Sequence, residues 1–88
     1  MKMRKLLLLL FTFICFSNVP AQELETIMKQ GNDFYQNKQF DEAINSYETI
    51  LKQGYISSEL FYNLGNAYYR VGQLGKSILY FEKYQFIN

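Results

Sequence analysis

Apolar side chains in the second half of this chain return every three or four positions, which is the period of an amphipathic α-helix. One stripe consists of Leu60, Phe61, Leu64 and Tyr68, and another of Leu74, Ile78 and Phe81. Together with the breaks between apolar runs, the pattern predicts helices over residues of about 24–36, 41–52, 58–71 and 74–86. The sequence therefore predicts an all-α protein.

The predicted helix ends carry matching signals. Gly54 and Gly72 follow the second and third helices, where glycine commonly terminates a helix. Ser57 or Ser58 is suited to cap the third helix, and the negative charge of Glu59 favours its first turn. The four helices thus form two helix-turn-helix units.

The two units are copies of one pattern, offset by 34 residues. Gly31 aligns with Gly65, and similar side chains continue the register on both sides. The aligned pairs are Gly31–Gly65, Asn32–Asn66, Phe34–Tyr68, Tyr35–Tyr69, Phe40–Leu74, Ala43–Ser77, Ile44–Ile78, Tyr47–Phe81 and Glu48–Glu82.

Glycine inside a helix costs about 1 kcal/mol relative to alanine, so Gly31 and Gly65 need a reason. Small residues are tolerated where two backbones must come close. We expect the first and second helices of each unit to cross at Gly31 and Ala43, and again at Gly65 and Ser77. The large side chains that fill the space beside these crossings are then Phe34, Tyr47, Tyr68 and Phe81.

A 34-residue helix-turn-helix of this kind resembles the tetratricopeptide repeat (TPR). YNLGNAYY and GKSILYFEKY are similar to the two helices of that repeat, and QGNDFYQNKQFDEAINSYETIL matches the preceding unit. The resemblance implies helical repeats that form the start of an α-solenoid. The chain departs from the family pattern at Ile50 and Tyr84, usually alanine, and at Tyr55, usually proline, so packing between repeats is expected to differ locally.

The stretch NLGNAYYRVGQLGKSILYFEKY is also similar to the TPR proteins of bacterial aerotolerance (Bat) operons. Gly75, followed by KSILYFEK, carries this narrower resemblance. It implies a protein that works at the cell envelope.

The first residues have the order of a secretory signal peptide: MKMRK, the uncharged run LLLLLFTFICF, then SNVPAQ. Val19 and Ala21 predict cleavage before Gln22, and an uncleaved N-terminal anchor is the alternative. The apolar run is short for a membrane span. Acylation of Cys15 would make a lipoprotein, but bulky Ile14 stands where a small residue is needed.

Cleavage would leave a chain without cysteine and therefore without disulfide or thiol chemistry. Three of the nine basic residues belong to the peptide. After cleavage, six basic and eight acidic residues would remain, so the net charge would fall from +1 to −2. We expect contact with the membrane only through the signal peptide during export. The absence of a basic stripe argues against nucleic acid as a partner.

We divide the chain into a signal peptide, 1–21, and two repeats over residues of about 24–57 and 58–88. Such stacks usually need about three repeats and a polar terminal helix. Since the last predicted helix is apolar, the chain is interpreted as the start of a longer protein, truncated after Asn88. A two-repeat protein that associates with itself through that helix is the alternative.

The sequence contains no catalytic constellation. Histidine is absent, and the acidic side chains are scattered over helix surfaces, with Asp41 and Glu42 best explained by the helix dipole. GQLGKS has only two residues between its glycines and does not match a phosphate-binding loop. We therefore predict no enzyme, no cofactor and no metal.

The remaining candidate site is a protein-binding surface on the first helix of each repeat, which the resemblance places on the concave face. Asparagine can both donate to and accept from a peptide backbone, and tyrosine gives a large contact area. An ordinary solvated or inter-repeat face is the alternative. The predicted binding residues are Met28, Asn32, Tyr35, Tyr62, Asn63, Asn66, Tyr69 and Arg70.

Some TPR proteins clamp a peptide's terminal carboxylate with Lys and Asn on these helices. Asn32 and Asn63 stand at two of those positions, but Met28 stands where the lysine is needed, so no such clamp is predicted.

The leading hypothesis is an exported TPR scaffold at the bacterial cell envelope that binds a protein or peptide of unknown identity. One alternative is a nutrient-binding outer-membrane lipoprotein with helical repeats. Another is the docking arm of an enzyme whose catalytic domain lies beyond Asn88.

Overall fold

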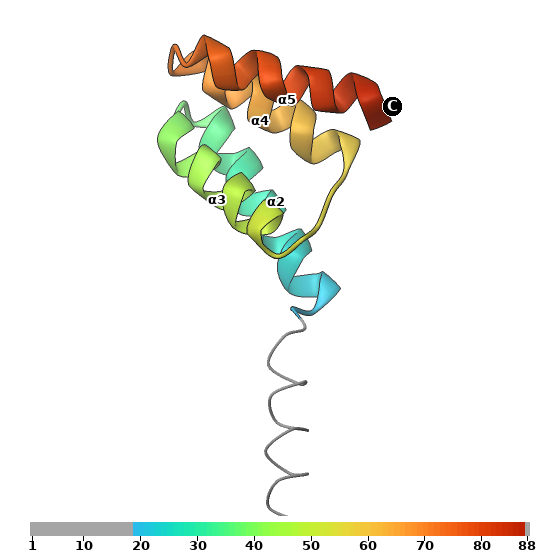
Figure 1. Ribbon diagram of the computed structural model, residues 1–88. Coiled ribbons are helices and arrows are strands. Elements are labelled where there is room, and N and C mark those ends of the chain that lie inside the picture. Colours follow the sequence, from blue (N-terminus) through green and yellow to red (C-terminus); the bar gives the residue numbers. More distant parts are fainter. Residues whose placement is uncertain (1–18, 88) are drawn as a thin grey trace, which may run out of the picture.

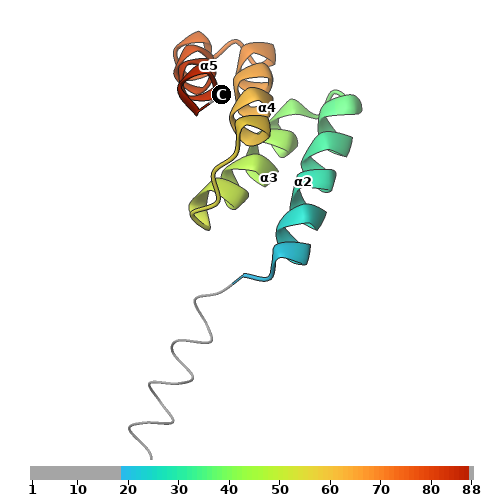
Figure 2. The same ribbon diagram turned by 90° about the vertical axis from the view of Figure 1, so that its right-hand side faces the viewer.

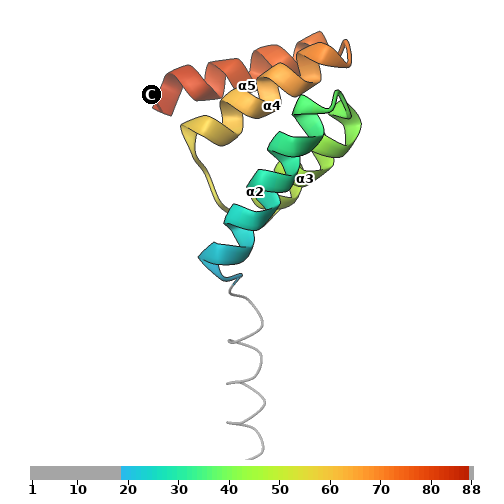
Figure 3. The same cartoon turned by 180° about the vertical axis from the view of Figure 1, so that it is seen from behind.

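Two antiparallel helix pairs make up the fold. The computed structural model describes residues 19–87, which contain α2 (Ala21–Gln36), α3 (Phe40–Lys52), α4 (Ser58–Arg70) and α5 (Leu74–Ile87). α2 packs on α3, α4 packs on α5, and α3 also contacts α4. Figure 1 shows the second pair lying across the first, and the side and back views show the same stacking (Figures 2 and 3). All regular structure in this part of the chain is helical, which confirms the all-α prediction.

The predicted helix boundaries agree with the structure to within one residue, except at the start of α2. This helix begins at Ala21 instead of about residue 24. The carbonyl of Pro20 accepts hydrogen bonds from the backbone N–H groups of Glu23 and Leu24, at 3.0 and 3.3 Å. The helix therefore starts three residues before Leu24, and the apolar periodicity did not indicate this because Gln22 and Glu23 are polar.

The predicted signal peptide falls almost entirely outside the described residues, as does Cys15. The predicted cleavage site, between Ala21 and Gln22, lies in the first turn of α2. No helix within residues 19–87 has the length and apolar content that a membrane crossing requires.

Ser57 and Gly72 mark the two ends of α4, as their residue types predict. The Ser57 hydroxyl accepts a hydrogen bond from the Leu60 backbone N–H at 3.1 Å, which caps α4. Gly72 follows α4 with φ of 82°, a left-handed conformation that suits glycine. Its counterpart one repeat earlier is Lys38, which adopts φ of 63° despite its side chain. The same turn geometry thus closes the first helix of both pairs.

An aromatic ring lies directly against a glycine in each helix pair. A Cβ added to Gly31 would stand 2.7 Å from Cε1 of Tyr47, and one added to Gly65 would stand 2.6 Å from Cε1 of Phe81. These distances are too short for any real Cβ contact. The second helix thus leaves no room for a side chain at either glycine, as predicted, but the expected reason was wrong: the nearest atoms belong to its side chains, chiefly the aromatic ring, and not to its backbone.

The small residues on the second helices complete the crossings. Ala43 in α3 is fully buried, and Ser77 in α5 is 3% exposed. The Ser77 hydroxyl donates a 2.8 Å hydrogen bond to the carbonyl oxygen of Gly65. The burial of this hydroxyl is thus compensated by a bond to the helix that it crosses.

The core lies between α3 and α4. Its buried residues are Ala43, Ile44, Tyr47, Ile50, Leu60, Leu64, Ala67 and Tyr68. The stripe predicted for the third helix is therefore buried as expected. The stripe of α5 differs: Leu74 and Ile78 are 57% and 58% exposed, whereas Ile44, the counterpart of Ile78, is buried where α3 meets α4. Self-association through this face of α5 stays a prediction.

Glu48 of α3 connects the two helix pairs. One of its carboxylate oxygens accepts hydrogen bonds from the hydroxyls of Tyr68 and Tyr80, at 2.9 and 3.0 Å. The two tyrosine rings stack in parallel, with centroids 5.7 Å apart. Burial and, next, the hydrogen bond to Glu48 raise the pKa of Tyr80 to about 12, and the same causes raise the pKa of Tyr68.

Replacing Gly65 by alanine tests the ring contact. Because the new Cβ would displace the Phe81 ring, we expect Gly65→Ala to lower the free energy of unfolding by about 1–3 kcal/mol. Gly75→Ala is the matched control, since nothing lies within 4 Å of its added Cβ. It should leave stability unchanged or raise it by up to about 1 kcal/mol through helix propensity. Chemical denaturation measures both, and equal effects would contradict the proposed contact.

Alkaline titration tests the Glu48 network. The unfolded chain releases the Tyr80 proton near pH 10, whereas the folded chain holds it until about pH 12. The folded state therefore binds more protons in this window, and the free energy of unfolding should fall as the pH rises from 10 to about 12. Tyr80→Phe should show a shallower fall in denaturation curves over this range. A slope identical to that of the unaltered protein would exclude a contribution from Tyr80.

Candidate functional site

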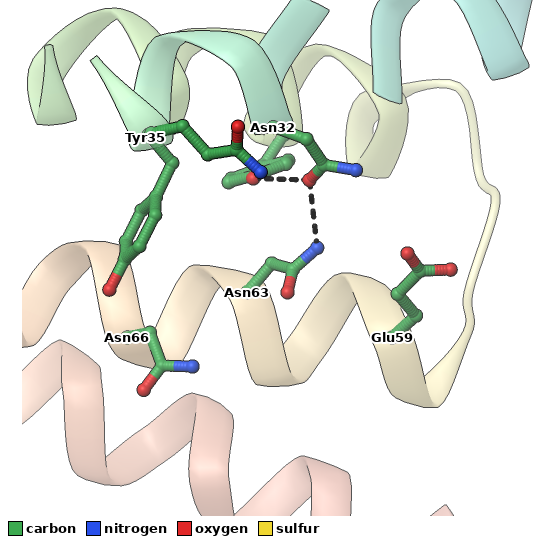
Figure 4. Close-up of a pocket in the computed structure, with 7 residues that line it drawn as sticks. Asn32, Tyr35, Glu59, Asn63 and Asn66 are labelled. Atoms are coloured by element: carbon green, nitrogen blue, oxygen red, sulfur yellow. Dashed lines mark hydrogen bonds between the residues drawn. The ribbon is translucent and has the colours of Figure 1, made fainter. Parts of the chain in front are cut away.

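A pocket of about 230 Å³ lies between α2 and α4. Side chains from both helices point into it, and Tyr47 of α3 also contributes (Figure 4). The lining residues are Asn32, Tyr35, Gln36, Tyr47, Glu59, Asn63 and Asn66. α2 and α4, the first helices of the two repeats, thus form one surface, and α3 packs against both of them.

A hydrogen-bonded group fixes the centre of the pocket. The Tyr47 hydroxyl donates to Oδ1 of Asn32 at 2.6 Å, and Nδ2 of Asn63 donates to the same oxygen at 3.2 Å (Figure 4). Both lone pairs of the Asn32 oxygen are therefore used within the protein. The ring of Tyr47 is the one that packs on Gly31, so the packing of the first helix pair also positions this asparagine.

The equivalent group in the second repeat is incomplete. Asn66 corresponds to Asn32, but Phe81 corresponds to Tyr47 and has no hydroxyl to donate. Within residues 19–87 the side chain of Asn66 makes no hydrogen bond, and Oδ1 of Asn63 accepts none. The pocket therefore offers amide groups that can still bond to a ligand.

The pocket has a negative electrostatic character. Burial raises the pKa of Tyr47 to about 12, and the electrostatic influence of Tyr35 and of the Glu59 carboxylate acts in the same direction. Glu59 lies in the first turn of α4 and projects toward the gap between the helices (Figure 4). It is the one charged residue among those that line the pocket.

A second pocket, of about 260 Å³, adjoins the first at Glu59. It lies beside the start of α2 and the loop that joins α3 to α4. Its lining residues are Ala21, Leu24, Glu25, Met28, Ile50, Tyr55, Ser57 and Glu59. The candidate surface thus continues from a polar pocket into a more apolar one along the same two helices.

Four of the eight predicted binding residues line the first pocket: Asn32, Tyr35, Asn63 and Asn66. Met28 lines the second, and its sulfur lies 4.0 Å from Nδ2 of Asn63.

The structure places the other three predicted residues outside both pockets. Tyr62 turns toward α5, where its ring lies 6.1 Å from that of Phe81 and 5.4 Å from that of Tyr84. Tyr69 is 62% exposed. The Arg70 guanidinium lies over the ring of Phe40, 5.2 Å from its centroid. Tyr62 therefore lies at the edge of the surface that faces α5, and Tyr69 and Arg70 lie at the end of α4.

Three residues that line the first pocket were not predicted from the sequence, namely Gln36, Tyr47 and Glu59. Tyr47 was assigned to packing and Glu59 to the helix dipole, and both assignments agree with their local positions. A signal for Tyr47 was nevertheless present, because the repeat alignment pairs it with Phe81 and the extra hydroxyl needs a partner.

The chemistry of the surface is that of non-covalent binding. Amides, tyrosines and one carboxylate can form hydrogen bonds and broad contacts with a peptide. Among residues 19–87, no three His, Cys, Asp or Glu side chains are grouped so that they could hold a metal ion.

Comparison with known proteins agrees with this architecture. A family model described as tetratricopeptide repeat matches residues 28–88, which include most of α2 and all of the following helices. The match is to the repeat family and does not separate the aerotolerance group from other members. No curated protein matches the chain. The pairing of the helices, the 34-residue register and the family match together show that this chain belongs to the tetratricopeptide repeat family.

Proposed function

We propose that this protein is a scaffold of the bacterial cell envelope that binds a peptide or protein partner on the surface formed by α2 and α4. Repeats of this family generally mediate protein–protein interactions, and their solenoids present extended concave binding surfaces. To that general role we add the surface on which the partner binds and the compartment in which the protein works.

The observation that carries the proposal is the pocket between α2 and α4, where the side chain of Asn66 and Oδ1 of Asn63 make no hydrogen bond within residues 19–87. An extended peptide supplies a donor and an acceptor at every residue, so it can form hydrogen bonds with these amides. Asn63 and Asn66 lie one turn apart on α4, so they can engage one bound segment. Tyr35 adds aromatic area inside the pocket, and exposed Tyr69 lies one turn beyond Asn66 on α4.

The N-terminal sequence supports the assignment to the envelope. The order of MKMRK, an apolar run and VPAQ is that of a secretory signal peptide. The similarity of residues 63–84 to TPR proteins of aerotolerance operons points to the same compartment. We propose the aerotolerance group as the subgroup, and the genes adjoining this one would test that assignment directly.

Substitutions in α4 separate the binding surface from the core. Leu64 is fully buried, so Leu64→Ala should cost roughly 2–5 kcal/mol of stability. Tyr69 is 62% exposed, so Tyr69→Ala should change stability little. It should nevertheless weaken partner binding by about 2 kcal/mol or more, as interface aromatics often do. Thermal unfolding measures the first effect, and capture of partners from envelope extract measures the second.

Asn66→Ala extends this test into the pocket, since its side chain makes no hydrogen bond within residues 19–87. If Tyr69→Ala unfolds the protein as Leu64→Ala does, Tyr69 belongs to the core. If Tyr69→Ala and Asn66→Ala are stable and capture the same partners with unchanged affinity, this surface does not bind them.

The mass of the exported protein tests the compartment. We expect the product recovered from the envelope to begin at Gln22, with the N-terminal glutamine cyclised to pyroglutamate. Intact-mass spectrometry distinguishes this product from a chain that retains residues 1–21. A protein that stays in the cytoplasm with Met1 in place would overturn the assignment to the envelope.

A further inference from the structure

The charge of the pocket between α2 and α4 narrows the kind of partner that it fits. Six of its seven lining residues are amides or tyrosines, and in both pockets every charged lining residue is acidic. Glu59 lines both pockets, and Glu25 lines the second. A ligand that enters between the two helices therefore meets carboxylates and neutral polar groups, with no lysine or arginine lining either pocket.

Glu59 is placed to meet a ligand. Its side chain extends from the first turn of α4 toward α2, on the same side as Asn63 (Figure 4). Within residues 19–87 it has neither an ion-pair partner nor a side-chain hydrogen bond. Its carboxylate lies close enough to Tyr47, which also lines the pocket, to help raise the pKa of that hydroxyl, although burial is the main cause.

Three basic side chains of α4 and α5 lie against aromatic rings. The ammonium group of Lys76 lies 5.1 Å from the ring centroid of Tyr68, and that of Lys83 lies 5.8 Å from the centroid of Phe61. The Arg70 guanidinium occupies the face of Phe40. None of these three cations lines either pocket, so none of them neutralises Glu59 there.

The remaining groups in the pocket also suit a cation. Oδ1 of Asn63 accepts no hydrogen bond among the described residues, so it can accept one from an ammonium or guanidinium group. The Tyr35 ring reaches toward α4 close to Asn66 (Figure 4), where an aromatic face can attract a positive charge. A carboxylate in the same position would instead face Glu59 and be repelled.

We propose that this pocket selects a basic side chain, lysine or arginine, of an extended peptide, with Glu59 as the residue that recognises its charge. The inference rests on the proposed function, because it assumes that the surface of α2 and α4 binds a peptide. It adds the chemical class of the residue that is bound, and it assigns to Glu59 a role beyond the helix dipole.

Titration with short peptides tests this preference on isotopically labelled full-length protein. The probes are acetylated and amidated pentapeptides Ala-Ala-X-Ala-Ala, in which X is lysine, arginine, glutamine or glutamate. NMR follows the side-chain amide signals of Asn32, Asn63 and Asn66. We expect the lysine and arginine peptides to shift these signals and to bind roughly two- to fivefold more tightly than the glutamine peptide. The glutamate peptide should bind most weakly.

Glu59→Gln should remove most of the preference for lysine over glutamine, and raising the salt concentration should reduce it. Glu59→Asp, which keeps the charge, should retain part of it. Glu82→Gln is the matched control, since Glu82 is an exposed carboxylate on α5 that lines neither pocket. Thermal unfolding of each variant confirms that the fold is intact.

The inference is overturned if the lysine peptide leaves the asparagine signals unmoved, if the glutamate peptide binds as tightly, or if Glu59→Gln behaves like Glu82→Gln. A partner whose capture depends on Tyr69 and Asn66 but not on Glu59 would support the proposed function while refuting the preference for a basic residue. If neither Tyr69→Ala nor Asn66→Ala affects capture, the surface of α2 and α4 does not bind the partner, and the proposed function itself is refuted.

Discussion

The structure depends on the contact between an aromatic ring and a glycine, made once in each helix pair. Tyr47 lies on Gly31 and Phe81 lies on Gly65, at distances that leave no room for a Cβ. Each glycine destabilises its helix by about 1 kcal/mol relative to alanine. Because it has no side chain, however, the second helix can place a large ring against the backbone of the first. Because both pairs make this contact at the same register, the same crossing is built twice.

That contact also sets the candidate site. The hydroxyl of Tyr47 extends past Gly31 to hold the amide oxygen of Asn32, so a packing residue determines the position of a surface residue. In the second repeat Phe81 makes the packing contact but leaves Asn66 without this bond. One asparagine is therefore fixed by the scaffold and the other remains available, and Asn63 joins the two halves of the surface.

Much of the fold could be predicted from the sequence because it depends on local chemistry and on the repeat. The apolar period, Gly54, Gly72 and Ser57 located the helices, and the 34-residue register showed that Gly31 and Gly65 are equivalent, although not that an aromatic ring lies against each of them. The site was harder to predict. Helical periodicity places Tyr62 on α4 beside Asn63, but only the packing of α5 shows that its ring meets Phe81 and Tyr84. The role of Glu59 in both pockets likewise depends on how α2 and α4 approach each other.

A double-mutant cycle between Gly65 and Phe81 tests the ring contact most directly. Gly65→Ala is measured by chemical denaturation in the unaltered protein and again in a Phe81→Ala background, where no ring remains to meet the new Cβ. If the ring is the obstacle, the destabilisation by about 1–3 kcal/mol should disappear in that background, or reverse to a gain of up to about 1 kcal/mol. An equal loss of stability in both backgrounds would show that Gly65 is needed for some other reason and would contradict the account.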